Sequence, residues 1–307
     1  KIPATLSIGL GFSGEKYGLS YNYARVAIDL ALARGGDQVV VKSMEGIKYY
    51  GGKREQTAKN TRVKARVKAE AMREFMIAKD QILVMGHKLG DSDSFGAAVG
   101  IYKIARTLEK KAHIVINEVT MSLRPIYNEF VNSEKFPDDM FVSSQEALRL
   151  VDENTMVIVV DTNKPNLTEC EELLTQVKTI AVLDHHRQGS NVIENAILSY
   201  IEPYASSTCE MVAEVLQYIA DDIKLDTIEA NSIYAGIMID TNNFMNRTGV
   251  RTFEAAAFLR RNGADITYVH KIFRDDLESY RAKADIIGNA EIYRDCFIIA
   301  RGAGMEI

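Results

Sequence analysis

The chain has 307 residues, 47% of them hydrophobic and 26% charged, which is ordinary for a globular protein and long enough for two domains. Its formal net charge of −5 argues against a large surface for duplex nucleic acid, because such surfaces are basic. The three cysteines lack paired spacing, no signal peptide is visible, and no apolar run reaches the roughly 18 to 20 residues that cross a bilayer. Because the chain begins with Lys1, we expect a fragment that lacks material at both ends.

Residues 1–50 are expected to form a small unit of their own. The segment 4–10 is predicted to be a strand, 21–34 a helix, and 39–42 a second strand rich in β-branched residues. This order, with a Gly-Gly-Asp turn at 35–37, resembles the closing part of diguanylate cyclase (GGDEF) domains. The catalytic hairpin of such a domain would lie upstream, so we predict a degenerate GGDEF-like unit without catalysis of its own.

Basic residues recur through 51–78 and alternate with apolar ones, which predicts a long basic helix that links two domains. Such a helix either presents a solvated charged face or binds nucleic acid. Aromatic residues for base stacking do not interleave with the charges, so we favour the solvated face.

The predicted main domain covers residues 79–285. Its first half alternates strands, at 81–86, 113–117, 156–160 and 179–183, with helices at 94–110, 144–152 and 167–175. This alternation predicts an α/β fold in which helices cover both faces of a parallel sheet. The second half is mostly helical, with helices expected at 207–219, 227–240 and 252–261. Residues 286–307 would begin a further strand-containing unit that is truncated.

Aspartate and histidine residues stand at the carboxyl ends of three of these strands. They are His87, Asp91 and Asp93 after the first strand, Asp161 after the third, and Asp184, His185 and His186 after the fourth. Because the carboxyl ends of parallel strands meet at one edge of a sheet, we expect these side chains to converge. Asp240, at the end of the helix 227–240, is a weaker candidate by itself.

Each of these residues also has a structural interpretation, as a helix cap, a turn carboxylate or a solvated loop residue. One helix start needs only one cap, however, and the surplus of carboxylates favours metal coordination. Oxygen and nitrogen ligands without thiolate suit Mn²⁺, Mg²⁺ or Fe²⁺ better than a structural zinc ion. The carboxylates are too numerous for one metal with open positions, so we predict two metals that share a bridging carboxylate.

The order of motifs, His87-x3-Asp91-x-Asp93, Asp161, Asp184-His185-His186 and Asp240, resembles the DHH phosphoesterase superfamily. The segments 206–210, 240–244 and 251–254, together with the cyclase-like unit and the basic helix, resemble the membrane-anchored cyclic-di-AMP phosphodiesterases of the GdpP type. The resemblance implies a DHH domain with a helical C-terminal part over about 79–285. It also implies the start of a truncated DHHA1-like domain at 286–307, although no Gly-Gly-Gly-His-like motif is present there.

The resemblance also assigns roles to the site residues. It places His87, Asp91 and Asp161 on one Mn²⁺, and Asp93, Asp161, His185 and Asp240 on a second, so that Asp161 bridges the pair. Asp184 would orient an imidazole, and His186 would act on the substrate phosphate as a hydrogen-bond donor or general acid. Arg247 and Arg251 are candidate phosphate contacts, with surface loop arginines as the equal alternative.

The implied function is hydrolysis of cyclic-di-AMP to the linear dinucleotide pApA by a water activated between two Mn²⁺ ions. One alternative keeps this chemistry and changes the substrate to short oligoribonucleotides or pApA itself. A second alternative is a catalytically silent nucleotide sensor, which the complete ligand set disfavours, and a pyrophosphatase would not explain the cyclase-like segment. The family further implies a homodimer and a cytoplasmic domain of a protein that is held at the membrane by segments absent from this chain.

Overall fold

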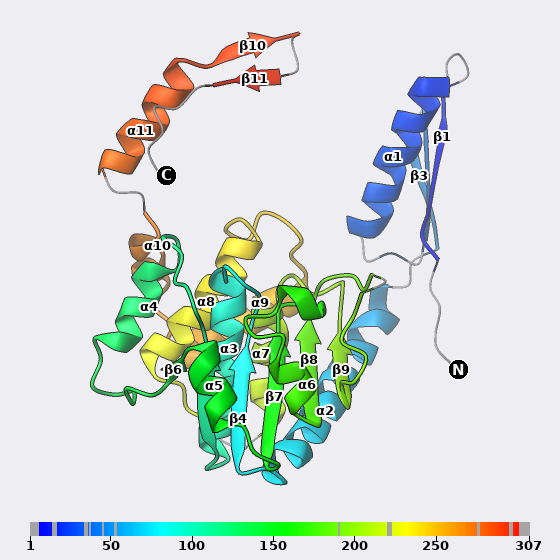
Figure 1. The fold of residues 1–307 in the computed structure, drawn as a ribbon. Coiled ribbons are helices and arrows are strands. Elements are labelled where there is room, and N and C mark those ends of the chain that lie inside the picture. Colours follow the sequence, from blue (N-terminus) through cyan, green and yellow to red (C-terminus); the bar gives the residue numbers. More distant parts are fainter. Residues whose placement is uncertain are drawn as a thin grey trace. The chain divides into compact units, whose positions relative to one another are not determined.

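A computed structural model of the chain divides into two compact units, residues 1–264 and residues 265–307 (Figure 1). The structure describes residues 6–13, 17–33, 36, 38–44, 46–51, 54–189, 191–219, 223–274, 277–294 and 297–300. The domain limits expected from the sequence, at 50, 78 and 285, stay predictions.

The first segment forms a small three-stranded sheet with one helix. Strand β2 (Gln38–Ser43) lies between β1 (Ile8–Phe12), to which it is parallel, and β3 (Gly46–Gly51), to which it is antiparallel. Helix α1 (Tyr17–Ala33) packs against β1 and β2. The predicted Gly-Gly-Asp turn falls largely outside the described residues, and a degenerate GGDEF-like origin stays a prediction.

Helix α2 (Arg54–Ile77) is the predicted basic helix. It buries one apolar face, whose residues are spaced by three or four positions, against α7 (Thr208–Ile219); they are Ala65, Ala69, Met72 and Met76. The Nζ atom of Lys68 donates a hydrogen bond to the carbonyl oxygen of Ser199 at 2.9 Å. Within the described ranges, no helix is both long and apolar enough to cross a membrane.

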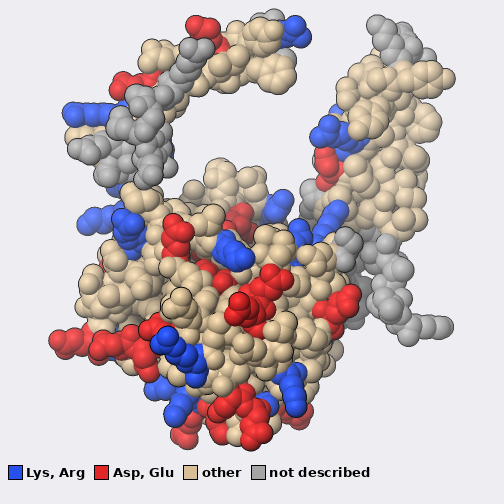
Figure 2. Space-filling model, in the orientation of Figure 1, with Lys and Arg blue, Asp and Glu red and all other residues tan. Residues whose placement is uncertain are grey.

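Lys and Arg side chains lie among Asp and Glu side chains over the face of the molecule drawn in Figure 2. This mixture of charges agrees with the modest net charge of −5. The expectation that the chain does not bind duplex nucleic acid stays a prediction.

The main sheet has six parallel strands in the order β6-β5-β4-β7-β8-β9. Their bounds are β4 (Gln81–Met85), β5 (Lys111–Val115), β6 (Phe141–Val142), β7 (Thr155–Val160), β8 (Thr179–Asp184) and β9 (Leu198–Ile201). Along the sequence, β5 and β6 are added on one side of β4. Strands β7, β8 and β9 are then added on its other side. The order therefore reverses between β4 and β7, and an open α/β sheet has its ligand crevice at such a point.

Both faces of the sheet are covered, as the uninterrupted apolar sequences of β4 and β7 require. Helix α3 (Ser92–Thr107) contacts β4, β5 and β7. On the opposite face, side chains of the sheet form one core with α5 (Ser144–Leu150) and α6 (Leu173–Gln176). The predicted α/β fold with a parallel sheet is confirmed.

The helical second half contains α7, α8 (Thr227–Asp240) and α9 (Val250–Arg261). The remaining elements are α4 (Arg124–Val131), a 3₁₀ turn at Pro165–Leu167, α10 (Ile266–Ile272), α11 (Leu277–Gly288), and the antiparallel hairpin β10 (Glu291–Tyr293) and β11 (Phe297–Ile299). The hairpin and α10–α11 belong to the second compact unit.

Several parts of the α/β domain differ from the prediction. Helix α4 was not predicted. Strands β6 and β9 were not predicted, because two and four residues are too few for a periodic signal. The predicted helix 167–175 was wrong in its first half. Backbone pairing of Thr168 with His87, and a hydrogen bond from the Glu169 N–H to the carbonyl oxygen of Gly86, hold that stretch beside the end of β4.

Helices α3 and α8 pack closely because glycines lie at their contact. A Cβ atom added at Gly236 of α8 would lie 2.4 Å from Cys209 Sγ and 2.9 Å from the Cα of Asp93. Glycine at this position therefore permits the approach that brings α8 to the first turn of α3.

We predict that Gly236→Ala lowers the free energy of unfolding by about 1–3 kcal/mol, because the added methyl group overpacks a backbone contact that cannot yield. Chemical denaturation measures this change. Gly18→Ala in α1 is the matched control, since a Cβ there meets no atom within 4 Å in the described part of the chain. Equal stability of the two variants would contradict the prediction.

Candidate metal centre

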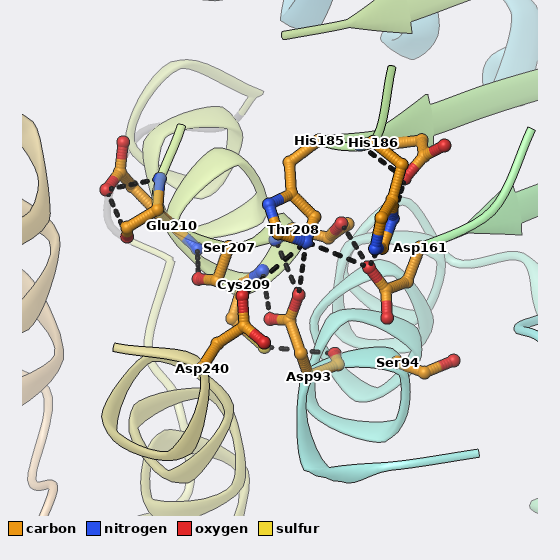
Figure 3. A network of polar contacts seen from close by, with 12 residues as sticks. Asp93, Ser94, Asp161, His185, His186, Ser207, Thr208, Cys209, Glu210 and Asp240 are labelled. Carbon is orange, nitrogen blue, oxygen red and sulfur yellow. Dashed lines mark hydrogen bonds and ion pairs between the residues drawn. The ribbon is translucent and has the colours of Figure 1, made fainter. Parts of the chain in front are cut away.

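The six predicted metal ligands converge at the carboxyl edge of the sheet. Strands β4, β7 and β8 are neighbours in the sheet and end side by side there. The predicted ligands His87, Asp91 and Asp93 follow β4, Asp161 follows β7, His185 follows β8, and Asp240 is the last residue of α8. Figure 3 labels four of them, Asp93, Asp161, His185 and Asp240. The strand pairs β4–β7 and β7–β8, together with the packing of α8 on α3, bring together residues up to 153 positions apart, from 87 to 240.

The orientation of His87 is fixed by its own backbone neighbour. The ring Nδ1 lies 2.9 Å from the carbonyl oxygen of Lys88, and since a carbonyl only accepts, Nδ1 is the donor. The other nitrogen, Nε2, lies 3.4 Å from Asp161 Oδ2 and 3.8 Å from Asp91 Oδ1. Asp161, and after it Asp91, raise the pKa of His87 to about 11. Nε2 is therefore the atom of His87 that a cation would meet.

Asp91 is the N-cap of α3, which is the helix-cap role that the sequence analysis gave as the alternative to metal coordination. Its Oδ1 accepts hydrogen bonds from the backbone N–H groups of Asp93 at 2.9 Å and Ser94 at 3.0 Å. Both cap bonds use the same oxygen, and the side chain is about half exposed, at 53%. Capping and coordination are compatible in this arrangement.

Asp93 joins the first turn of α3 to the first turn of α7. Its Oδ2 accepts a hydrogen bond from the Thr208 N–H at 2.7 Å, and its Oδ1 accepts one from the Cys209 N–H at 2.8 Å. The residue is buried, and burial together with the carboxylates of Asp161 and Asp240 raises its pKa. The helix N-terminus offsets part of this cost, because its free N–H groups favour negative charge.

Asp161 lies at the centre of the cluster. Its Oδ2 faces His87, whereas its Oδ1 accepts a hydrogen bond from Thr208 Oγ1 at 2.9 Å and lies 3.6 Å from His185 Nε2. The backbone has a φ of 59°, in the left-handed region that Asp tolerates better than most residues. Its N–H donates to the carbonyl oxygen of Leu183 at 2.9 Å, which holds the turn against β8.

His185 and Asp240 close the other side of the cluster. His185 Nε2 lies 3.8 Å from Asp93 Oδ2, 3.6 Å from Asp161 Oδ1 and 3.5 Å from Asp240 Oδ2. Asp240 stands at the C-terminal end of α8, where the helix dipole disfavours a carboxylate. Burial raises the pKa of Asp240, and the Asp161 carboxylate adds to the rise. Within the described part of the chain, Asp240 Oδ2 is buried without a hydrogen-bond partner.

His186 is held by Asp184, a buried residue that ends β8. Asp184 Oδ1 accepts hydrogen bonds from the N–H of His186 at 3.0 Å and from its ring Nδ1 at 2.8 Å. Asp184 Oδ2 accepts a further bond from Asn163 Nδ2 at 2.5 Å. Because an ionised carboxylate only accepts, Nδ1 carries hydrogen and Nε2 is left for other partners. The Asp184 hydrogen bond raises the pKa of His186, whose side chain is 58% exposed.

The donor atoms fit divalent cations. Three groups of side chains place one ligand atom each within 4.8 Å of one another, namely His87–Asp91–Asp161, Asp93–His185–Asp240 and Asp161–His185–His186. The cluster holds more carboxylates than imidazoles, contains no thiolate ligand, and leaves the buried oxygen of Asp240 without a donor. These properties suit Mn²⁺, Mg²⁺ or Fe²⁺. Asp161 and His185 each belong to two of the three groups, and Asp161 is the carboxylate among them.

The two candidate phosphate contacts differ in their surroundings. Arg251 lies on α9, and its Nε and Nη2 donate to the two carboxylate oxygens of Glu214, each at 2.6 Å. Its side chain is 13% exposed, so it is not the surface loop arginine of the alternative interpretation. Arg247 is exposed in the segment that follows α8, with a φ of 54°. A role in phosphate binding stays a prediction for both residues.

Sequence reasoning did not single out Thr208, Cys209 or Asn163 as site residues. Thr208 contacts the carboxylates of Asp161 and Asp93, Cys209 that of Asp93, and Asn163 that of Asp184. The run Ser-Ser-Thr-Cys-Glu at 206–210, directly before an apolar helix, is a signal for a helix N-terminus. The partner of that terminus is Asp93, 115 positions away from Thr208 along the chain. No local sequence pattern can predict a hydrogen bond between residues so far apart in the chain.

The sequence profile of the DHH family, N-terminal domain, matches residues 81–237. The chain belongs to the DHH family. It is 40% identical to the cyclic-di-AMP phosphodiesterase GdpP of Bacillus subtilis (strain 168) over 302 residues, which are 97% of this chain and 46% of that protein. It is 39% identical to the cyclic-di-AMP phosphodiesterase PdeA of Listeria monocytogenes serotype 1/2a (strain 10403S) over 306 residues, with 98% and 46% covered. This DHH-family chain thus spans about half the length of the curated relatives it matches.

The fold of the DHH-family chain also occurs in an exopolyphosphatase-related protein from Bacteroides fragilis. The two structures share a TM-score of 0.63 at 18% sequence identity, over 75% of this chain and 67% of the other. At this identity the comparison supports the fold alone. The resemblance to the DHH superfamily and to its cyclic-di-AMP phosphodiesterases is confirmed.

We predict that Asp240→Asn stabilises the metal-free protein, because it removes one of several crowded carboxylates at the unfavourable end of α8. A gain of about 1 kcal/mol would raise Tm by about 2–4 °C in a chain of this size. The same change should reduce the rise in Tm that added Mn²⁺ gives the unchanged protein, because Asp240 belongs to one of the two groups of predicted ligands around Asp161.

Asp80→Asn is the control, since Asp80 precedes β4 and accepts a hydrogen bond from Asn154 at the opposite end of the strand. It should keep the Mn²⁺ effect. A lower metal-free Tm for Asp240→Asn than for Asp80→Asn would show that the carboxylate cluster is not under repulsive strain.

Proposed function

We propose that this chain contains the centre of a metal-dependent phosphodiesterase that hydrolyses cyclic-di-AMP to linear pApA. The observation that carries the proposal is the convergence of six carboxylate and imidazole ligands around the shared carboxylate of Asp161. The relatives named as cyclic-di-AMP phosphodiesterases, which align with 97% and 98% of the chain, support the choice of substrate.

The ligand atoms would divide between two cations. His87, Asp91 and Asp161 would hold one, and Asp93, Asp161, His185 and Asp240 would hold the other, with Mn²⁺ proposed and Mg²⁺ or Fe²⁺ possible. When bound, such ions supply positive charge for the phosphate oxygens and acidify a water molecule. The same charge would relieve the repulsion among the buried carboxylates.

His186 is the proposed general acid. Asp184 fixes its Nδ1–H, and this hydrogen bond raises the pKa of His186, which favours the protonated ring that a general acid requires. Hydrolysis forms a bond from the water oxygen to phosphorus and breaks the bond from phosphorus to the 3′ oxygen. The leaving 3′ oxygen takes the proton from Nε2, and the product keeps a 5′-phosphate. Before that transfer, the N–H group also stabilises the charge that develops on the phosphate.

Asp184 and Asn163 would orient His186 without touching the substrate. Asn163 Nδ2 donates to one oxygen of Asp184, and the other oxygen accepts from His186. Both Asp184 and Asn163 are buried, so the direction of the imidazole is set by a fixed partner rather than by solvent.

The proposal extends to the whole protein by way of its relatives. We propose that it acts as a homodimer on the cytoplasmic side of the membrane, anchored by segments outside residues 1–307. Both relatives are longer than this chain, which covers 46% of each, and this difference in length supports the proposal of further segments. Removing the proposed anchor from a full-length protein and following its distribution between membrane and cytosol tests this part.

We predict that Asp161→Ala lowers Mn²⁺-dependent hydrolysis of cyclic-di-AMP by at least about 10³-fold, since both cations lose their shared ligand. Chromatography of pApA formation by the chain and by a full-length protein measures the loss, and Asp80→Asn serves as the active control. Faster turnover of pApA or short oligoribonucleotides than of cyclic-di-AMP would favour the alternative substrate. Binding of cyclic-di-AMP without any turnover would favour the sensor.

We predict that His186→Gln lowers kcat by about 10²–10⁴-fold, the usual contribution of a general acid, with little change in Mn²⁺ affinity. Steady-state kinetics and calorimetric titration with Mn²⁺ are measured on the same preparation. An equal loss of Mn²⁺ affinity would make His186 a metal ligand instead of the acid.

A further inference from the structure

Thr208, the first residue of α7, contacts two carboxylates that come from different parts of the chain (Figure 3). Its hydroxyl donates a hydrogen bond to Asp161 Oδ1 at 2.9 Å, and its backbone N–H donates one to Asp93 Oδ2 at 2.7 Å. The residue is completely buried, at 0% exposure. A single residue therefore links the carboxylate that follows β7 to the carboxylate in the first turn of α3.

The turn that carries Thr208 is itself held in place by the chain around it. Ser207 Oγ accepts a hydrogen bond from the N–H of Glu210 at 3.0 Å. The buried carboxylate of Glu210 accepts hydrogen bonds from Ser206 Oγ at 2.5 Å and from Thr252 Oγ1 at 2.6 Å. The hydroxyl of Thr208 thus extends from a rigid support, and a rigid support is what a positioning contact needs.

The Thr208 hydroxyl contacts the oxygen of Asp161 on the His185 side of the cluster, and not the oxygen on the His87 side. Asp161 Oδ1, which accepts the Thr208 hydroxyl, is the oxygen that faces His185, whereas Oδ2 faces His87. The hydroxyl engages one lone pair of Oδ1 and leaves the other free. The backbone of Asp161 is in the left-handed region, a conformation that the surrounding contacts have to hold in place.

We propose that Thr208 is a positioning residue that holds Asp161 and Asp93 in register for the cation on the His185 side of the cluster. This inference rests on the proposed metal-dependent function and adds a residue that contacts neither the cation nor the substrate. Outer contacts of this kind typically change metal affinity by about 10–100-fold. The His87 side, which Thr208 does not contact, should change much less.

Thr208→Val removes the hydroxyl, keeps the side-chain volume and retains the backbone N–H bond to Asp93. Thr208→Ser keeps the hydroxyl, and Thr208→Ala lacks both the hydroxyl and the methyl group. Thr155→Val is the matched control, because Thr155 is equally buried and its hydroxyl donates to the Asp152 carboxylate at 2.7 Å, at the opposite end of the same strand β7.

Mn²⁺ alone is titrated by calorimetry, and electron paramagnetic resonance of bound Mn²⁺ separates a coupled pair from a single ion. For Thr208→Val we expect one of two Mn²⁺ ions to bind at least about tenfold more weakly, with the coupled-pair signal replaced by that of a single ion. Thr208→Ser should stay within about threefold of the unchanged protein, and so should Thr155→Val. Should Thr208→Val fail to fold, the same difference is expected between Thr208→Ser and Thr208→Ala.

Three outcomes would overturn the inference. Equal affinities and a coupled-pair signal in Thr208→Val, or in Thr208→Ala where it replaces Val, would contradict it while leaving the proposed function intact. Failure of the unchanged protein to bind Mn²⁺ would overturn the proposed function and this inference together. If Thr155→Val lost as much Mn²⁺ affinity as Thr208→Val, the loss would come from lower stability in general and not from the positions of Asp161 and Asp93.

Discussion

The crowding of carboxylates at one edge of the sheet is the constraint on which the site depends. Asp91, Asp93, Asp161 and Asp240 lie around two imidazoles, and burial and mutual repulsion raise the pKa of Asp93 and of Asp240. Such a cluster costs free energy in a folded protein unless positive charge compensates it. In the metal-free protein, the fold supplies part of that charge through the proton of His87, whose pKa is raised, and through the N-termini of helices. A cation held by Nε2 of His87 would replace that proton. Cations would supply the rest.

The helix ends near this cluster differ in their electrostatic effect on its carboxylates. The first turns of α3 and α7 offer N–H groups to Asp91 and Asp93, which is favourable for a carboxylate. The last residue of α8 is Asp240, where the dipole is unfavourable and where, among the described residues, one buried oxygen has no hydrogen-bond donor. The protein thus stabilises Asp91 and Asp93 by its own N–H groups, whereas Asp240 would gain most from an added cation. This difference explains why one ligand position should respond most strongly to metal binding.

Close packing of α3 and α8 places these helix ends together. Gly236 lets the backbone of α8 approach Asp93, and Cys209 occupies the remaining space at the contact. The same contact therefore contributes to stability and to the geometry of the ligands. A substitution that disturbs the packing changes the metal centre even when every ligand is retained.

Much of the fold, and the convergence of the candidate ligands, could be predicted from the sequence. The apolar runs that became β4, β5, β7 and β8 need burial on both faces, and Asp and His residues follow three of them, β4, β7 and β8, so a parallel sheet with a candidate site at one edge followed from local patterns. The short strands β6 and β9 escaped prediction because their pairing depends on neighbours in the sheet.

Only the tertiary structure decided how the ligands are supported. Thr208 meets Asp161 across 47 positions, Asn163 meets Asp184 across 21, and Arg251 is paired with Glu214 across 37. The sequence by itself determined which residue types were available and on which elements they stand, because periodicity and side-chain chemistry are local properties. Which atoms face one another depends on the packing of distant elements, and that information is absent from any single stretch of the chain.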